Sequence, residues 1–180
     1  ADNAESTQPA GNVAIGAWAN FRSTGNFNTA VGENALYGNS DAALRSHYNN
    51  VAIGRISSYD MTTGYGNVAV GYASATNITS GYSNVILGNE AGHTLTSGKK
   101  HVLIGNQAGY SMSTGTGSVM VGEYAGGNNT ADYTIGIGYQ AIDANTTGAG
   151  NIGIGYYALG ANTTGNYNTA IGYHAIYSNV

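Results

Sequence analysis

The chain of 180 residues has no cysteine, a single proline and few charged side chains. Without cysteine it forms neither a disulfide framework nor a thiolate metal site. Charged residues make up 8% of the chain, against about 25% in an ordinary globular domain. The thinly spread net charge of −4 offers no basic patch, and no apolar run approaches the roughly 18 residues of a membrane span. We therefore expect neither a nucleic-acid partner nor membrane insertion.

Glycine is abundant, with 29 residues, and much of it is periodic. Aligning the chain on the Gly of "AIG", "AVG" and similar triplets gives ten repeat glycines, separated by 16, 22, 17, 17, 17, 17, 16, 17 and 17 residues. Such a period indicates a repeat architecture. The repeat glycines are Gly16, Gly32, Gly54, Gly71, Gly88, Gly105, Gly122, Gly138, Gly155 and Gly172.

The residues just before each repeat glycine follow a strand pattern. The residue three before it is always β-branched, and the residue one before it is always aliphatic. Two branched side chains two positions apart are typical of a strand with one buried face. We therefore expect the second column to form the core: Ile15, Val31, Ile53, Val70, Leu87, Ile104, Val121, Ile137, Ile154 and Ile171.

A repeat of about 17 residues has no room for a helix of ten or more residues. It also buries too little alone, but stacked repeats form parallel ladders with one coil every ~4.7–4.9 Å. The sequence therefore predicts an all-β fold, a parallel β-solenoid (β-roll) of about ten coils. It occupies residues 12–180 after an N-terminal extension at 1–11, and the 22-residue interval marks an insertion around 38–49.

The thin core leaves self-association as the main question. Small residues recur in fixed columns, and tyrosine is plentiful, which favours several chains packed side by side; we expect a homotrimer. A fourth apolar column either faces a partner chain or widens the core. A rival arrangement is a filament whose protomers stack coil on coil through open ends, since Asn179 and Val180 read like the opening of another "NVAIG". The fourth column contains Leu36, Ile142, Leu159 and Ile176.

The run "TGNYNTAIGYHAIYSN", preceded by "TGAGNIGIGYYALGANTTG", resembles the "NTAVGYxAL" repeats of bacteriophage tail-fibre proteins. It is also similar to the "NxVAIG" repeats of trimeric autotransporter adhesin heads, although those are usually shorter than seventeen residues. The resemblance covers nearly the whole chain from Asn12 onward. It implies a trimeric, left-handed β-roll that is extracellular or carried on a virion, and that serves as the shaft or head of an attachment fibre.

Exposed tyrosines are the first candidates for binding. Tyr72, Tyr139, Tyr156 and Tyr173 each follow a repeat glycine, and Trp18 lies one position further on in its repeat. Aromatic columns suit stacking on sugar rings, so we expect attachment to a glycan or another surface receptor. The alternative is that these rings only pack between chains or along the rod.

The insertion is the second candidate, because it concentrates charge in a chain that has little. Insertions in repeats map to loops, often on the binding face. The side chains concerned are Asp41, Arg45 and His47. A simple bulged turn is the alternative.

Nothing in the sequence indicates catalysis, a metal site or a cofactor. His47, His93, His101 and His174 are scattered over different repeat positions, and we expect them on the surface. Paired Ser and Thr residues such as Thr79-Ser80 and Thr146-Thr147 recur before the strands. A stacked hydroxyl column of this kind leaves ice binding as a third possible function.

Overall fold

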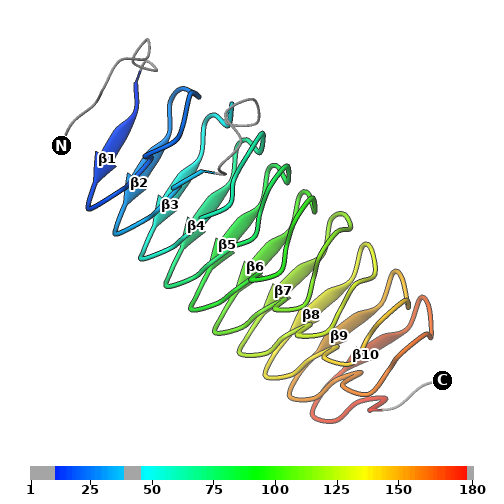
Figure 1. Ribbon diagram of the computed structural model, residues 1–180. Helices are drawn as coiled ribbons and strands as arrows, with labels where there is room; N and C mark the ends of the chain where they lie inside the picture. Colours follow the sequence, from blue (N-terminus) through cyan, green and yellow to red (C-terminus); the bar gives the residue numbers. More distant parts are fainter. Residues whose placement is uncertain (1–10, 39–45, 178–180) are drawn as a thin grey trace.

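The computed structural model describes residues 11–38 and 46–177 and confirms the parallel β-solenoid (Figure 1). Ten strands of three residues form one sheet in chain order, and every strand pairs in parallel with the next. No helix occurs within these two segments. The strands are β1 (Val13–Ile15), β2 (Thr29–Val31), β3 (Val51–Ile53), β4 (Val68–Val70), β5 (Val85–Leu87), β6 (Val102–Ile104), β7 (Val119–Val121), β8 (Ile135–Ile137), β9 (Ile152–Ile154) and β10 (Thr169–Ile171).

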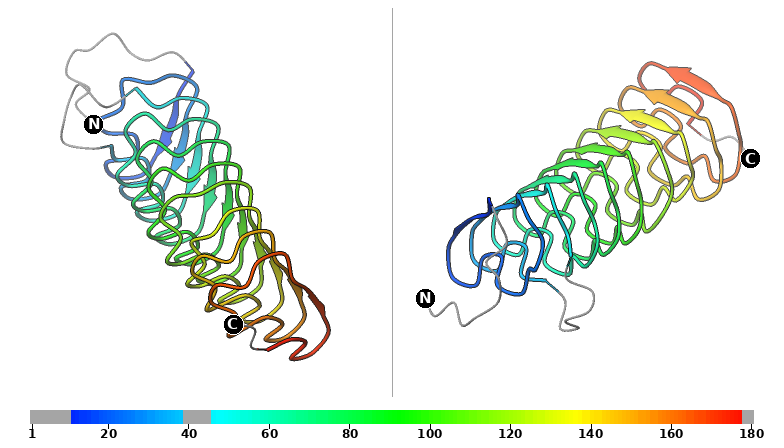
Figure 2. Two further views of the ribbon diagram at one scale, coloured as in Figure 1. Left: turned by 90° about the vertical axis from the view of Figure 1, so that its right-hand side faces the viewer. Right: turned by 90° about the horizontal axis from the view of Figure 1, so that it is seen from above.

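The coils stack so that equivalent repeat positions lie above one another. Val51 pairs with Val68 and Ile53 with Val70, and the same register continues along the sheet. The strands line one side of the rod, and turns form the remainder of each coil (Figure 2). Residues 39–45 of the predicted insertion lie outside the described part of the chain.

The strands face the opposite way to the sequence prediction. In β6, the central Leu103 is fully buried, whereas Val102 and Ile104 on either side of it are partly exposed. At the ends of the sheet Ile15 is 60% exposed and Ile171 is 69% exposed. The predicted core column is therefore wrong, because none of its members is buried: Ile15, Val31, Ile53, Val70, Leu87, Ile104, Val121, Ile137, Ile154 and Ile171.

The reversal has a steric reason. Alternation along a strand determines which side chains share a face, but not which face lies inside. A coil of about 17 residues is narrow, and in four of the ten strands the buried central side chain is alanine, the smallest of the triplet. The two branched side chains that flank this central position then lie on the outer surface of the sheet.

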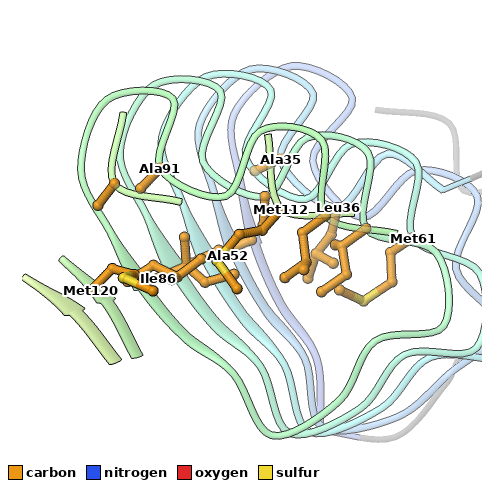
Figure 3. Packing of buried hydrophobic residues seen from close by; sticks show 14 of the residues in the cluster. Ala35, Leu36, Ala52, Met61, Ile86, Ala91, Met112 and Met120 are labelled. Atoms are coloured by element: carbon orange, nitrogen blue, oxygen red, sulfur yellow. The ribbon is translucent and has the colours of Figure 1, made fainter. Parts of the chain in front are cut away.

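The interior is filled by side chains of complementary size (Figure 3). In the coils before β7, large inner side chains come from the turn side at Met61, Ile78, Leu95 and Met112, and from the strands themselves at Ile86 in β5 and Leu103 in β6. After β7, the large inner side chains are Ile142 and Leu159. The central residue of the strand there is glycine, Gly136 in β8 and Gly153 in β9. The fourth apolar column therefore widens the core at Leu36, Ile142 and Leu159, which are all fully buried.

A ladder of buried asparagine side chains runs along the coils, immediately before the strands. Asn67 donates its backbone N–H to Asn50 Oδ1 at 2.9 Å, and its Nδ2 donates to the same oxygen at 3.1 Å. Nδ2 also donates to the Gly81 carbonyl at 2.8 Å. Each amide thus ties three coils together and satisfies polar groups that the narrow interior hides from water. The sequence analysis missed this ladder.

Two histidines are buried, so the prediction that all four lie on the surface is wrong. His101 occupies the asparagine position of its coil, and its Nδ1 accepts the Ser118 backbone N–H at 3.1 Å. His47 stands where most coils have glycine in the turn, and neither of its ring nitrogens has a hydrogen-bond partner. Burial lowers the pKa of His47 from 6.5 to about 4.

The size complementarity of the core predicts coupling between Gly153 and Ile142. A Cβ on Gly153 would lie 2.7 Å from Ile142 Cγ1 and 2.8 Å from the Ala158 carbonyl oxygen, so Gly153→Ala should cost about 1–3 kcal/mol of unfolding free energy through overpacking, part of it against the Ile142 side chain. Ile142→Ala should cost about 2–5 kcal/mol. Ile142→Ala removes the side chain that the new Cβ at position 153 would contact, and that Cβ partly fills the space left behind. The double variant should therefore lose at least about 0.5 kcal/mol less than the sum of the losses in the two single variants. Urea unfolding of the four proteins measures this coupling, and strict additivity would contradict it.

Burial of His47 predicts that the fold weakens in mild acid. The unfolded chain takes up this proton near pH 6.5, whereas the folded chain takes it up only near pH 4. Protonation of His47 therefore does not affect the free energy of unfolding above pH 6.5. As the pH falls towards 4, the free energy of unfolding decreases by up to about 3 kcal/mol. His47→Ala should flatten the pH dependence of urea unfolding, with the exposed His174→Ala as control. Equal pH profiles for wild type and His47→Ala would refute the assignment.

Candidate functional site

The outer face of the sheet is a continuous apolar surface. Its two columns contain only valine, isoleucine, leucine and threonine, without a charged residue. Ten strands at ~4.8 Å spacing make this face about 43 Å long. Stacked neighbours shield much of each side chain in the middle of the sheet, but Ile53 is still 38% exposed and Ile137 37%. Contiguous exposed apolar surface is a common feature of protein interaction sites.

A second surface, the C-terminal aromatic cluster, adjoins the C-terminal ends of the last three strands. Tyr139 and Tyr156 stack with ring centroids 5.3 Å apart, and Tyr156 and Tyr173 with centroids 5.1 Å apart. These three rings are all exposed. Their stacking follows from the fold, because each occupies the position after a repeat glycine in consecutive coils. We define the cluster as Tyr139, Tyr156, Tyr157, Tyr173, His174 and Tyr177, and Tyr124 adjoins it through an edge contact with Tyr139.

The other predicted binding residues do not join this cluster. Tyr72 lies nearer the N-terminal end, with the Arg55 guanidinium 5.8 Å from the centre of its ring. Trp18 belongs to the first coil, where it packs edge-on against Phe21 at 4.6 Å. His47 is buried, so it is not available to a surface ligand. Asp41 and Arg45 lie outside the described residues.

Two further tyrosine ladders were not singled out in the sequence analysis. Tyr48, Tyr65 and Tyr82 stack at 5.1 and 4.8 Å on the edge where the chain enters the strands. Tyr37 and Tyr59 stack at 4.9 Å in another column. Their common signal is a constant distance from the repeat glycine, six residues before it in the first ladder and five after it in the second.

The hydroxyl column that suggested ice binding is engaged with the main chain. Thr62 Oγ1 donates to the Thr79 carbonyl at 2.9 Å, and Thr79 Oγ1 donates to the Thr96 carbonyl at 3.1 Å. These residues lie in turns and bends of the coil. The first hydroxyl of these pairs is therefore engaged, and the column lies in bends of the coil instead of on a flat strand surface, which does not favour ice binding.

Within residues 11–38 and 46–177, no group of three or more His, Asp or Glu side chains is arranged to hold a metal ion. The same segments contain no helix that is long and apolar enough to cross a membrane. None of the protein-family models, curated proteins or solved structures compared with the chain matches it. The surfaces of the solenoid are therefore the basis for inferring its function.

Proposed function

We propose that the chain is a non-enzymatic segment of an extracellular fibre, forming its shaft or head, that assembles as a homotrimer and attaches to a host or other surface through glycans. The outer sheet face carries this proposal. It is apolar over the full length of the rod, it is free of charge, and it is exposed in the single chain.

Self-association accounts for this face better than a small ligand does. The surface is long and narrow and carries at least one aliphatic side chain in every coil, so another copy of the same rod matches it along its whole length. A closed cyclic assembly covers the face in every protomer and stops further lateral growth. The resemblance to tail-fibre and adhesin-head repeats favours three chains around the axis.

The C-terminal aromatic cluster supports attachment through glycans. A tyrosine presents an apolar ring for stacking on a sugar and a hydroxyl for hydrogen bonding. Tyr156 is 42% exposed and Tyr173 is 76% exposed, and both belong to one stacked array. The array offers several equivalent contact points along the rod, which suits a chain of sugar units.

Adjacent residues of β6 provide a matched test of the trimer. Ile104→Asp places a carboxylate on the outer face, so the coil should stay folded while the trimer dissociates. Leu103→Asp buries an unpaired carboxylate in the core, so that variant should unfold. Analytical ultracentrifugation measures the oligomeric state, and circular dichroism measures the fold.

A folded wild-type chain that stays monomeric at micromolar concentrations would overturn the trimer. Open-ended polymers that grow with concentration would favour the filament instead. If Ile104→Asp remains trimeric, the chains are joined through a surface other than the sheet face.

The aromatic cluster predicts which substitutions abolish attachment. Tyr156→Ala with Tyr173→Ala should weaken glycan binding at least about tenfold, because stacking contacts contribute on the order of 1 kcal/mol or more each. The matched control is Tyr65→Ala with Tyr82→Ala, which removes another stacked pair of the same spacing. Binding to a glycan array measures the effect. Equal binding by the wild type and the cluster variant would remove the cluster from the proposal.

A further inference from the structure

An open hollow of about 470 Å³ lies along the edge of the solenoid where the chain enters β7, β8 and β9. This volume falls within the roughly 300–1,000 Å³ typical of ligand sites. We call it the edge groove. It lies beyond the N-terminal ends of the strands, whereas the C-terminal aromatic cluster follows their C-terminal ends. Its walls are formed by Thr114, Gly115, Thr116, Thr130, Ala131, Asp132, Thr146, Thr147 and Ala149.

The groove opens where the repeat length changes. In the preceding coils this edge is closed by parallel bridges from Tyr48 through Tyr65, Tyr82 and Lys99 to Thr116. The next interval between repeat glycines has 16 residues instead of 17, and within the described residues the bridges end there. A smaller hollow of about 310 Å³ lies on the same edge, between residues 24–27 before β2 and residues 46–49 near the end of the 22-residue interval. Departures from the regular period thus open the edge at two places.

Several polar groups in the edge groove remain available. Asp132 Oδ1 accepts the Thr116 backbone N–H at 2.8 Å, which fixes the carboxylate and leaves Oδ2 without a hydrogen bond in the described chain. The side-chain hydroxyls of Thr114, Thr116 and Thr147 make no hydrogen bond to any described residue. The groove therefore presents one oriented acceptor surrounded by hydroxyl groups that both donate and accept.

An exposed tyrosine adjoins this polar surface. Tyr133 follows Asp132 directly and is 64% exposed. Its Cδ1 lies 2.9 Å from the place that a Cβ on Gly117 would take, so the absence of a side chain there makes room for the ring. Tyr167 packs in the same way on Gly150, two coils further on, and is 84% exposed. The two rings are thus separated by about 10 Å along the rod.

We propose that the edge groove binds a neutral glycan, with the Tyr133 ring stacked on a sugar and Asp132 Oδ2 accepting hydrogen bonds from its hydroxyls. This inference deepens the attachment role proposed above and rests on it, but it assigns a site separate from the C-terminal aromatic cluster. An apolar ring face beside a fixed carboxylate and free hydroxyls matches the alternating apolar and polar surfaces of a pyranose.

The charge of the groove selects against acidic glycans. Asp132 is the one charged residue in its lining, and no lysine or arginine accompanies it. Lys99, one coil before Thr116, lies with its Nζ 5.7 Å from the centre of the Tyr82 ring, on the side away from the groove. A sialylated or sulfated sugar would therefore meet the Asp132 carboxylate at close range, with no lysine or arginine among the described residues that line the groove.

The test uses the full chain on an array of neutral hexose and N-acetylhexosamine oligosaccharides with their sialylated and sulfated counterparts. The strongest neutral oligosaccharide is then titrated by calorimetry. We expect neutral glycans to bind, Tyr133→Ala to weaken binding at least about tenfold and Asp132→Asn at least about fivefold. Asp132→Asn keeps an oxygen for the Thr116 N–H, and thermal melting of each variant verifies its fold.

The matched control is Phe27→Ala. Phe27 occupies the column of Tyr133, packs on Gly11 and is 61% exposed, but none of the described residues that line the hollow beside it carries a carboxylate. Its loss should leave glycan binding unchanged. Absence of binding to any neutral glycan, or stronger binding of the acidic counterparts, would overturn the inference.

The remaining outcomes separate this inference from the proposed function. Binding that is lost in Tyr156→Ala with Tyr173→Ala, but kept in Tyr133→Ala, would overturn the edge groove and leave attachment through the aromatic cluster in place. Binding that depends on Tyr133 and persists in a monomeric Ile104→Asp protein would support the groove even where the trimer fails.

Discussion

The close approach of successive coils at the repeat glycines is the constraint on which the other features depend. A Cβ on Gly32 would lie 2.7 Å from the Gly54 carbonyl oxygen, and φ at the repeat glycines lies between +124° and +144°. Only glycine combines this conformation with this proximity. Because the corner has no side chain, Gly88 can donate its N–H to the Val70 carbonyl at 2.8 Å. The parallel ladder and the vertical alignment of side chains follow from that spacing.

The same spacing limits what the interior can contain. Coils of about 17 residues enclose a narrow core, so volume added at one position is removed at another, as with Ile142 beside Gly153. Polar groups inside need partners within the coil stack, which the asparagine amides supply. His47 is an exception, because its ring is enclosed without a hydrogen bond and is kept neutral by burial. The branched aliphatic side chains that do not fit inside form the outer face that the proposed trimer covers.

The period, the strands and their register could be predicted from the sequence, because all three depend on spacing. The orientation of the strands could not, since the rule that places aliphatic side chains inside fails when the interior accepts only alanine or glycine in many coils. Asn67 and its equivalents form a column in the sequence, but a single sequence does not show that their side chains hydrogen-bond from coil to coil. The stacking of Tyr139 with Tyr156 follows from their shared position. The edge groove lies where one coil is a residue shorter than its neighbours. The sequence shows the shorter interval but not its effect on the surface.

The positions of the surfaces are compatible with assembly through one surface and attachment through two others. The strands occupy the three positions before each repeat glycine, so the two proposed binding surfaces lie beyond opposite ends of the strands. Tyr156 lies just after the corner, whereas Asp132 and Tyr133 lie in the turn before β8. Association through the sheet face would therefore cover the aliphatic columns while the ligand-binding residues remain on its two margins. In a trimer each margin would be presented three times, and repeated weak contacts with a glycan-coated surface would add up through multivalency.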